Sequence, residues 1–89
     1  MTSEPPHDAS LRFEYDRERR ARHVERSVRP ELAGLADDRS RTSISREEAT
    51  LSVRIEAEDL VALRAATNTW LTLLEVAERA AEAGTGAET

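Results

Sequence analysis

The sequence predicts an α+β fold with the element order β-α-β-β-α, in which a three-stranded antiparallel sheet carries two helices on one face. Three observations predict it. Apolar and polar residues alternate from Leu11 to Tyr15 and again from Leu51 to Ala57, which is typical of half-buried strands. Apolar residues recur at helical spacing between these segments. A long apolar helical pattern follows the second one.

The chain of 89 residues is expected to hold one small domain, at residues 10–83. Residues 1–9 are polar and contain a Pro pair, so we expect a disordered arm there, and the small residues of 84–89 should form a frayed tail. A domain of this size hides only about 60–65% of its unfolded surface, so association often completes it.

The first helix should follow the first strand directly. Asp16 is a suitable N-cap, because its carboxylate can accept hydrogen bonds from the free N–H groups of the first turn. Ala21, Val24 and Val28 form the apolar side of this helix. The helix should stop near Pro30, because the residue before a proline is disfavoured in the α region.

A hairpin is expected in the middle of the chain. Residues 32–38 contain a glycine and are interpreted as a connector. Residues 39–46 form a polar strand with Ile44 as its apolar anchor, and Glu47–Glu48 make a charged tip before the strand that ends at Ala57.

The last helix is expected to run unbroken from Asp59 to Ala83, and it is apolar around about 220°, where one core needs somewhat more than about 100°. One stripe is bulky and should pack on the sheet: Leu60, Leu63, Thr67, Trp70, Leu74, Ala77 and Ala81. Leu63, Trp70 and Leu74 in particular should lie beneath Phe13, Val53 and Ile55. A second stripe is mostly small: Ala62, Ala66, Thr69, Leu73, Val76 and Ala80.

Something must cover the second stripe. The first helix of the same chain could cover part of it, and a second copy of the protein or a different helical partner could cover the rest. Because small side chains allow close approach of another helix, we expect this stripe to be a partner interface.

Composition excludes several classes of function. The chain has no cysteine, hence no disulfide or thiolate site, and its first residues have no basic stretch or apolar core of a secretion signal. No apolar run approaches the 18 or so residues of a membrane span, so we expect a cytoplasmic protein without membrane contact.

Charge is unevenly distributed. The net charge is −5, and all 13 basic residues are Arg, which is expected of a high-salt cytoplasm or of a GC-rich genome; we predict a halophilic archaeon as the source. Six Arg and three acids lie between Asp16 and Arg29, a local charge of +3. This segment is either a solvated helix face or a surface that attracts a polyanion, with four Arg in one helix as the candidate contacts: Arg17, Arg19, Arg20 and Arg22.

The sequence does not indicate an enzyme, and we expect no catalytic residue, cofactor or metal site. His7 lies in the expected arm and His23 among arginines, and no set of His and carboxylate residues has the spacing of metal ligands. The glycines do not form a phosphate-binding loop.

Three short motifs resemble the signature of the small dimerising (CTAG/Pcc-type) subunit of the KEOPS complex, which reads approximately A-x-D-x-x-A-L-R-x-x-x-N-[ST]-aromatic-L. They are Ala57-Glu58-Asp59, Ala62-Leu63-Arg64 and Asn68-Thr69-Trp70-Leu71. The segments 11–15 and 24–31 resemble the first strand and the end of the first helix of that family. The resemblance covers about residues 10–82.

The resemblance implies a function in tRNA modification. KEOPS makes the threonylcarbamoyl modification of adenosine in the anticodon loop of ANN-decoding tRNAs. Its small subunit is not the catalyst; it forms a homodimer, binds helices of the catalytic subunit and thereby joins two of them, and it can add contacts to tRNA. Arg64 and Asn68, one turn apart, would share a rim of this interface and could bind a partner or phosphate.

A DNA-binding regulator is the alternative. A strand that enters a helix, as Ser52 to Leu60 does, also occurs in ribbon-helix-helix proteins, whose paired strands read the major groove. That fold breaks its helical region after about ten residues, so the continuity of residues 60–82 discriminates between the two interpretations.

Overall fold

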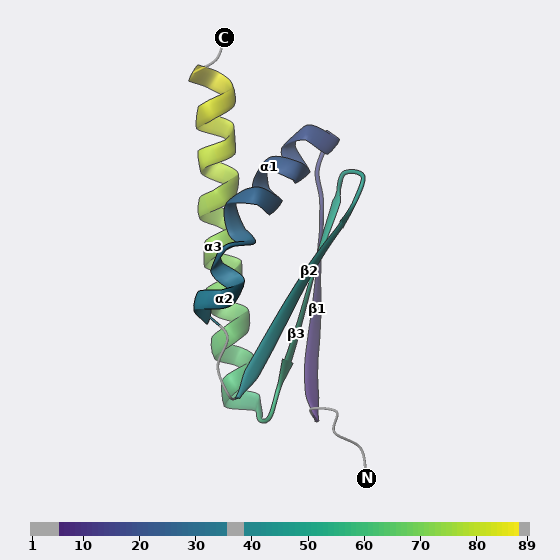
Figure 1. Ribbon diagram of the computed structural model, residues 1–89, viewed down its shortest axis with the longest axis vertical. Coiled ribbons are helices and arrows are strands. Elements are labelled where there is room, and N and C mark those ends of the chain that lie inside the picture. Colours follow the sequence, from purple (N-terminus) through teal and green to yellow (C-terminus); the bar gives the residue numbers. More distant parts are fainter. Residues whose placement is uncertain (1–5, 36–38, 88–89) are drawn as a thin grey trace.

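The computed structural model describes residues 6–35 and 39–87 of the chain. Figure 1 shows an α+β architecture with one sheet and its helices on one side, as predicted. The elements in order are β1 His7–Glu14, α1 Glu18–Val28, α2 Glu31–Leu35, β2 Ser40–Glu47, β3 Thr50–Ala57 and α3 Leu60–Ala87.

The sheet is antiparallel with the strand order β1-β3-β2, so β3 is central and β1 and β2 are its two edges. Leu11 and Ile44 flank Val53 on the helix side. Burial alternates strictly along β3. The buried residues are Leu51, Val53, Ile55 and Ala57, and the residues between them face the other side of the sheet.

The core lies between the sheet and the helices. Trp70 and Leu74 of α3 meet Val24 and Val28 of α1 over the buried residues of β3, and each of these four side chains is at most 2% exposed. The predicted apolar side of α1 is confirmed, since Ala21 is buried as well.

The hairpin between β2 and β3 turns at Glu48 and Ala49, one residue later than the predicted tip. Glu48 has φ 55°, which an L-residue adopts at a cost. Its backbone carbonyl accepts a 3.1 Å hydrogen bond from the Arg46 guanidinium, which helps to hold this conformation.

Both predicted ends of the domain differ from the structure. The strand starts at His7 rather than after residue 9, because backbone pairing with β3 continues to His7 opposite Ala57 whatever the polarity of the side chains. Residues 84–87, predicted as a frayed tail, continue α3, since extending an existing helix is easier than starting one and Gly costs about 1 kcal/mol. The remainders of the predicted arm and tail, 1–5 and 88–89, lie outside the described residues.

Two local predictions around α1 are also corrected. Arg17, not Asp16, is the N-cap residue, and it makes no side-chain capping bond. The connector after Pro30 contains the short helix α2, whose Leu32 and Leu35 pack against the core. Apolar contact of these two leucines explains why the segment becomes helical in spite of its glycine; residues 36–38 lie outside the described residues.

The molecule is elongated, with extents of 54 × 21 × 18 Å. The 28 residues of α3 span about 42 Å, whereas an eight-residue strand spans about 27 Å, so α3 projects past the sheet (Figure 1). A helix longer than its sheet has surface that its own domain does not cover.

Candidate interaction surface on the long helix

The start of α3 is fixed by Asp59, one of the two residues predicted to begin it. The Asp59 carboxylate accepts a 2.7 Å hydrogen bond from the Ala62 N–H, and the Arg39 guanidinium lies 2.6 Å away. The Ala62 N–H and, secondly, Arg39 lower the pKa of this carboxyl group. Asp59 thereby caps the first turn of α3 and ties it to Arg39, just before β2.

The bulky stripe of α3 is buried along most of its length, as predicted. Trp70, Leu74, Ala77 and Ala81 are buried, and Leu63 packs half-buried against them. Leu60 is the exception: it is 57% exposed at the first residue of α3.

The second stripe divides into two parts. Ala62 is buried, and Ala66 and Leu73 are half-buried against the core, so the domain itself uses them. Thr69, Val76 and Ala80 are exposed. The expected interface residues thus lie along one side of α3, but half of them are already in contact with the core of the chain.

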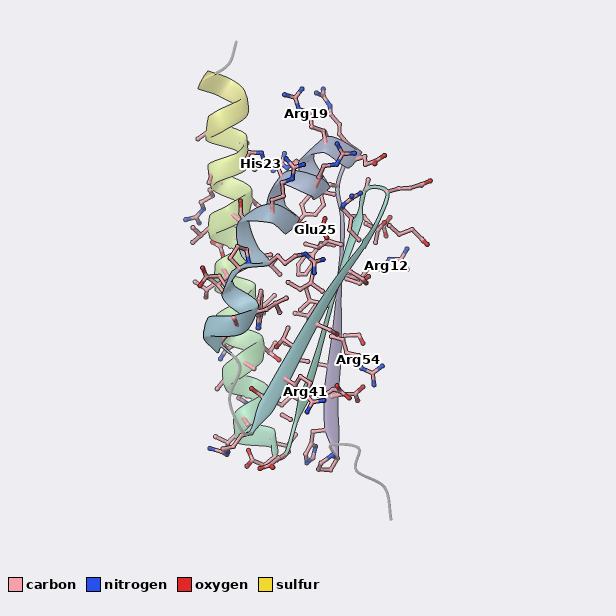
Figure 2. All side chains as sticks on the ribbon, viewed as in Figure 1. Arg12, Arg19, His23, Glu25, Arg41 and Arg54 are labelled. Carbon is pink, nitrogen blue, oxygen red and sulfur yellow. The ribbon has the colours of Figure 1, made fainter. Side chains whose placement is uncertain are left out.

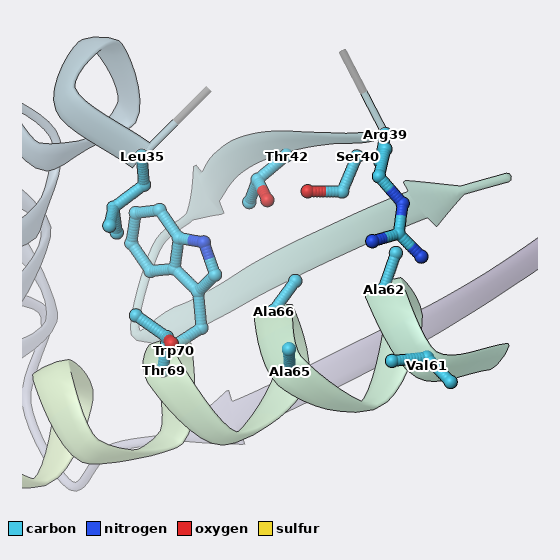
Figure 3. A pocket seen from close by; sticks show the side chains of 10 residues that line it. All are labelled: Leu35, Arg39, Ser40, Thr42, Val61, Ala62, Ala65, Ala66, Thr69 and Trp70. Atoms are coloured by element: carbon cyan, nitrogen blue, oxygen red, sulfur yellow. The ribbon is translucent and has the colours of Figure 1, made fainter. Parts of the chain in front are cut away.

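A groove of about 210 Å³ lies where this side of α3 meets α2 and β2 (Figure 3). Leu35 and Thr42 form one wall, Ala62 and Ala66 the floor, and Thr69 the other wall. The groove is small and apolar at its floor, which suits a side chain of a partner rather than a metabolite.

Beyond the groove, α3 presents an exposed face without charge, which we call the small-residue face. Its six members recur at spacings of three or four: Val61, Ala65, Thr69, Thr72, Val76 and Ala80. Val61, Ala65 and Thr72 belong to neither of the two stripes predicted from the sequence. The helical wheel places these three residues side by side, but it does not show which side of the helix faces the sheet. The burial of Trp70 in the core shows this.

The charged residues of α3 occupy the adjoining part of its surface. Arg64 and Asn68, predicted to share a rim, are both exposed there, and Arg79 pairs with Glu75 at 2.6 Å. The charged flank and the small-residue face are thus two adjoining parts of the exposed surface of α3.

The four arginines predicted as a cluster, one at the N-cap of α1 and three within it, do not all lie on one side of the helix. Arg20 turns toward α3, where its guanidinium lies 3.9 Å from Glu82 and its Nε is buried without a hydrogen-bond partner among the described residues. Arg22 pairs with Glu18 at 2.9 Å. Arg17 and Arg19 are exposed, and Figure 2 shows Arg19 and His23 on the outer side of α1.

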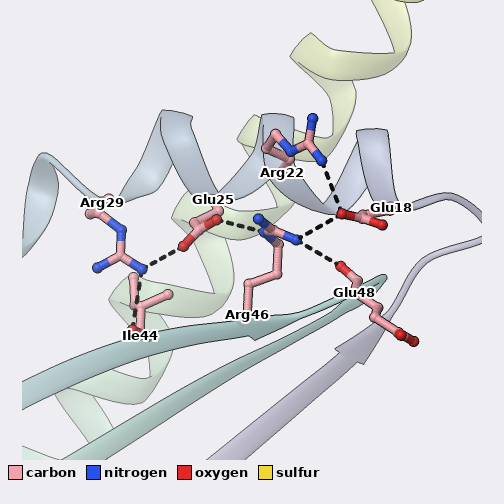
Figure 4. Close-up of polar contacts among 7 residues, drawn as sticks. All are labelled: Glu18, Arg22, Glu25, Arg29, Ile44, Arg46 and Glu48. Carbon is pink, nitrogen blue, oxygen red and sulfur yellow. Dashed lines mark hydrogen bonds and ion pairs between the residues drawn. The ribbon is translucent and has the colours of Figure 1, made fainter.

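Both acids of α1 form ion pairs with an arginine of β2 (Figure 4). Arg46 lies between Glu25 at 2.8 Å and Glu18 at 3.6 Å, and Arg29 also bonds to Glu25. Hydrogen bonds from Arg29 and then Arg46 lower the pKa of Glu25. The outer ridge of α1 is left basic because its carboxylates are engaged on the inner side.

The end of β1 is tied to α3 by a polar contact. The Tyr15 hydroxyl donates a 2.6 Å hydrogen bond to the Glu78 carboxylate, and burial, followed by this bond, raises the pKa of Tyr15. A shallow hollow of about 450 Å³ lies beside the pair, and Arg20 also lines it. The contact holds α3 over β1 and β3.

Among the residues that the structure describes, no group of three or more His, Cys, Asp or Glu could hold a metal ion. Within the same residues, none of the helices is long and apolar enough to cross a membrane. The helix α3 is a single unbroken helix, which contradicts the ribbon-helix-helix alternative, because that fold requires a break in this region.

Comparison with known proteins completes the description of this surface. No curated protein sequence matches the chain significantly. Among solved structures, the chain is similar to one described as the crystal structure of the binary complex Gon7–Pcc1, with a TM-score of 0.66 and 15% sequence identity over 94% of this chain and 98% of that one. At this identity the likeness shows the fold. The family model described as "Transcription factor Pcc1" matches residues 8–82. The chain therefore belongs to the Pcc1 family.

Proposed function

We propose that the chain is a non-catalytic assembly subunit of the KEOPS complex, which joins two catalytic subunits for threonylcarbamoyl modification of adenosine in ANN-decoding tRNAs. Membership of the Pcc1 family supports this, as does the resemblance of the Ala57 to Leu71 motifs to the small KEOPS subunit. A solved neighbour of the same fold was crystallised with a protein partner, Gon7. The carrying observation is the exposed, uncharged small-residue face of α3.

The face suits a helical partner. Val76 is 57% and Val61 70% exposed, although both are large apolar residues. Alanine and threonine between them let a second helix approach to about 8–10 Å between axes. The groove beside Thr69 offers a pocket for an anchoring side chain of that helix. In the proposed complex, a helix of the catalytic subunit covers this face.

A variant on this face tests the proposal. Val76→Arg should leave the fold intact, because the side chain is exposed, and should abolish co-purification with the KEOPS catalytic subunit by placing a charge in an apolar contact. Glu75→Arg is the matched control, because Glu75 is the residue before Val76 but lies on the charged flank. This variant should bind as the wild type does. Wild-type affinity of Val76→Arg would contradict the proposed interface.

Leu73 is unsuitable for this test. An arginine in place of this half-buried residue would also disturb the core against which it packs, so loss of binding would not identify an interface. The exposed position Val76 separates the two effects.

Contact with tRNA is the second part of the proposal. The outer ridge of α1 carries Arg19, Arg22, His23 and Arg26, which recur at spacings of three and four and are all exposed. An arginine ridge attracts a phosphate backbone, and the salt dependence of binding becomes steeper with each phosphate that an arginine neutralises.

The location and the source of the protein are also proposals. We place this chain in the cytoplasm, where the tRNA that it would help to modify is found. Its origin in a halophilic archaeon stays a prediction.

Substitution of arginines separates this ridge from the arginine that faces α3. Arg19→Ser combined with Arg22→Ser and Arg26→Ser should weaken tRNA binding by the assembled complex and reduce the salt slope by about one for each phosphate that is no longer neutralised. Arg20→Ser, which removes the arginine directed at Glu82, is the control and should leave the slope unchanged. An unchanged slope in the triple variant would identify the ridge as a solvated surface.

A further inference from the structure

The face of the sheet that points away from the helices is a regular grid of polar side chains. Side chains that stand opposite one another in the sheet point to the same side of it. On the outer face they form four rows across β1, β3 and β2, made up only of Ser, Thr, Arg, Asp and Glu. The rows are Asp8 with Glu56 and Arg41, Ser10 with Arg54 and Ser43, Arg12 with Ser52 and Ser45, and Glu14 with Thr50 and Glu47.

Charge is ordered on this grid. The two middle rows contain two arginines, Arg12 and Arg54, and four serines without an acid, so their formal charge is +2. The two outer rows contain four acids and one arginine, Arg41, which stands opposite Glu56. An anion is therefore attracted to the middle of this face and repelled from both of its ends.

The two middle rows enclose a hollow of about 380 Å³, which we call the serine hollow. The strand backbone at Leu11 and Val53 forms its floor, because these two side chains lie on the helix side of the sheet. Because serine is short, it leaves the backbone uncovered between the longer arginines. The side chains that line the serine hollow are Ser10, Arg12, Ser43, Ser45, Ser52 and Arg54.

The serine hollow offers hydrogen-bond donors that no other group uses. Among the residues that the structure describes, none of its four serine hydroxyls forms a hydrogen bond. Arg12 stands opposite Ser52, and Arg54 is two residues further along β3, so the two arginines are diagonal neighbours. Such neighbours lie about 7–8 Å apart, which lets two long side chains contact one ligand. Figure 2 shows both arginines on the outer side of the sheet.

The ion pairs that these arginines form are open to exchange. Arg54 lies 3.0 Å from Asp8, and Arg12 lies 3.9 Å from Glu14. All four side chains are more than half exposed, and pairs of this kind add little to stability. A phosphate group accepts two parallel hydrogen bonds from one guanidinium, so it can replace a single exposed carboxylate contact.

We propose that the serine hollow binds the phosphate group of a small phosphorylated molecule. A phosphomonoester carries a charge of about −1.5 to −2 at pH 7, which the two arginines match. Its terminal oxygens accept hydrogen bonds, and the guanidinium groups and serine hydroxyls donate them. The rest of the ligand extends into solvent, because the hollow opens on an exposed face. This inference goes beyond the proposed function and does not depend on it.

The acids at the ends of the face favour a single phosphate group over a polynucleotide. Along the strands, Asp8 and Glu56 follow the serine hollow on one side, and Glu14 and Glu47 follow it on the other. A nucleic acid repeats its phosphates, and its affinity grows with the number that cations neutralise. A chain of phosphates would meet carboxylates as soon as it left the two middle rows.

Titration of the isotope-labelled chain with inorganic phosphate tests the site by NMR. At about pH 7.5 the probe is mostly a dianion. With the ionic strength held at about 0.15 M by sodium chloride, screening stays constant. Backbone N–H signals of the two middle rows should shift and saturate, while those of α3 stay unchanged. Shifts that do not saturate, or that are as large in α3 as in the middle rows, would overturn the proposal.

An arginine variant and a matched control locate the bound phosphate. Arg54→Gln should weaken phosphate binding on the order of tenfold, because it removes charge-assisted hydrogen bonds. Arg41→Gln removes the same charge from the same face, but Arg41 lies outside the serine hollow and opposite Glu56. At this salt concentration it should change the dissociation constant by less than about twofold. Equal weakening by both variants would mean that the whole face attracts phosphate, and the proposed site would be wrong.

A variant of the neighbouring acid should act in the opposite direction. Asp8→Asn removes the exposed carboxylate that lies 3.0 Å from Arg54, so the guanidinium is released for the ligand and a negative charge beside the serine hollow is lost. Phosphate affinity should rise severalfold, and circular dichroism should show an unchanged fold, since Asp8 is exposed. Unchanged or lower affinity would contradict the assignment of Arg54 to the phosphate.

A short single-stranded RNA without a terminal phosphate distinguishes the source of the phosphate group. It should leave the signals of the two middle rows in place at concentrations at which inorganic phosphate saturates them. If the RNA shifts these signals and loses affinity in Arg54→Gln, the serine hollow is part of a nucleic-acid surface and the proposal is overturned. None of these measurements involves the catalytic subunit, so their outcome is separate from that of the proposed function.

Discussion

At the residue scale, single polar side chains determine how the elements meet. Asp59 ends the β3–α3 connection by capping α3, and Arg39 pairs with it across the chain. Glu25 performs a similar task for α1, because it binds Arg29 of its own segment and Arg46 of β2. These interactions were not predictable from the sequence: thirteen arginines and eighteen acids allow many pairings, and only the packing of α1 on β2 selects one.

The Glu25 network predicts a dependence of stability on pH. The folded-state pKa of Glu25 lies below its ordinary value of 4.5, so its contribution to stability is present above about pH 4.5 and is lost as the pH falls through the folded-state pKa. Glu25→Gln should therefore be less stable than the wild type at pH 7, and the difference should shrink below about pH 4.5.

Urea unfolding at a series of pH values measures this difference. Glu31→Gln, which changes an exposed acid of α2, serves as the control and should follow the wild type. A constant gap between Glu25→Gln and the wild type from pH 7 to pH 3 would contradict the role assigned to the carboxylate.

At the element scale, the sequence predicted types and order well and boundaries poorly. Strict alternation in residues 51–57 and the bulky stripe of α3 are side-chain patterns, and both are confirmed. The start of β1 at His7 depends on backbone pairing with β3, which side-chain polarity does not reveal. Three members of the predicted interface stripe, Ala62, Ala66 and Leu73, pack against the core of this chain, and the role of the stripe as an interface stays a prediction.

The orientation of α3 can be tested by truncating two residues of different exposure. Leu74→Ala should lower the free energy of unfolding by about 2–5 kcal/mol, because this fully buried side chain contacts the core of α1 and β3. Val76→Ala, two residues on and exposed, should change it by less than about 0.5 kcal/mol. Urea unfolding measures both, and equal losses would mean that α3 is rotated differently on the sheet.

At the scale of the whole molecule, the two layers give the chain separate surfaces. The small-residue face of α3 belongs to the helix layer and the polar outer face of the sheet to the other layer, so that occupation of one leaves the other accessible. A subunit that joins two larger proteins needs this independence. The polar outer face of the sheet, where Figure 2 shows Arg12, Arg41 and Arg54, remains in solvent in this arrangement.

The small size of the domain limits its stability as an isolated chain. A chain of 89 residues buries a modest fraction of its surface, and here half-buried Phe13 and exposed Leu60, Leu71 and Val76 remain outside its core. Partners that cover these residues would stabilise the fold by mass action, so the isolated chain should be less stable than the chain in its assembly.

The mass of the assembly formed with the KEOPS catalytic subunit tests the central claim most directly. After co-purification, light scattering should give a particle that contains two copies of this chain and two of the catalytic subunit, and Val76→Arg should reduce it to the free dimer of this chain. If the two proteins elute separately at micromolar concentration, with this chain alone at its own mass, the claim that it is the assembly subunit is contradicted.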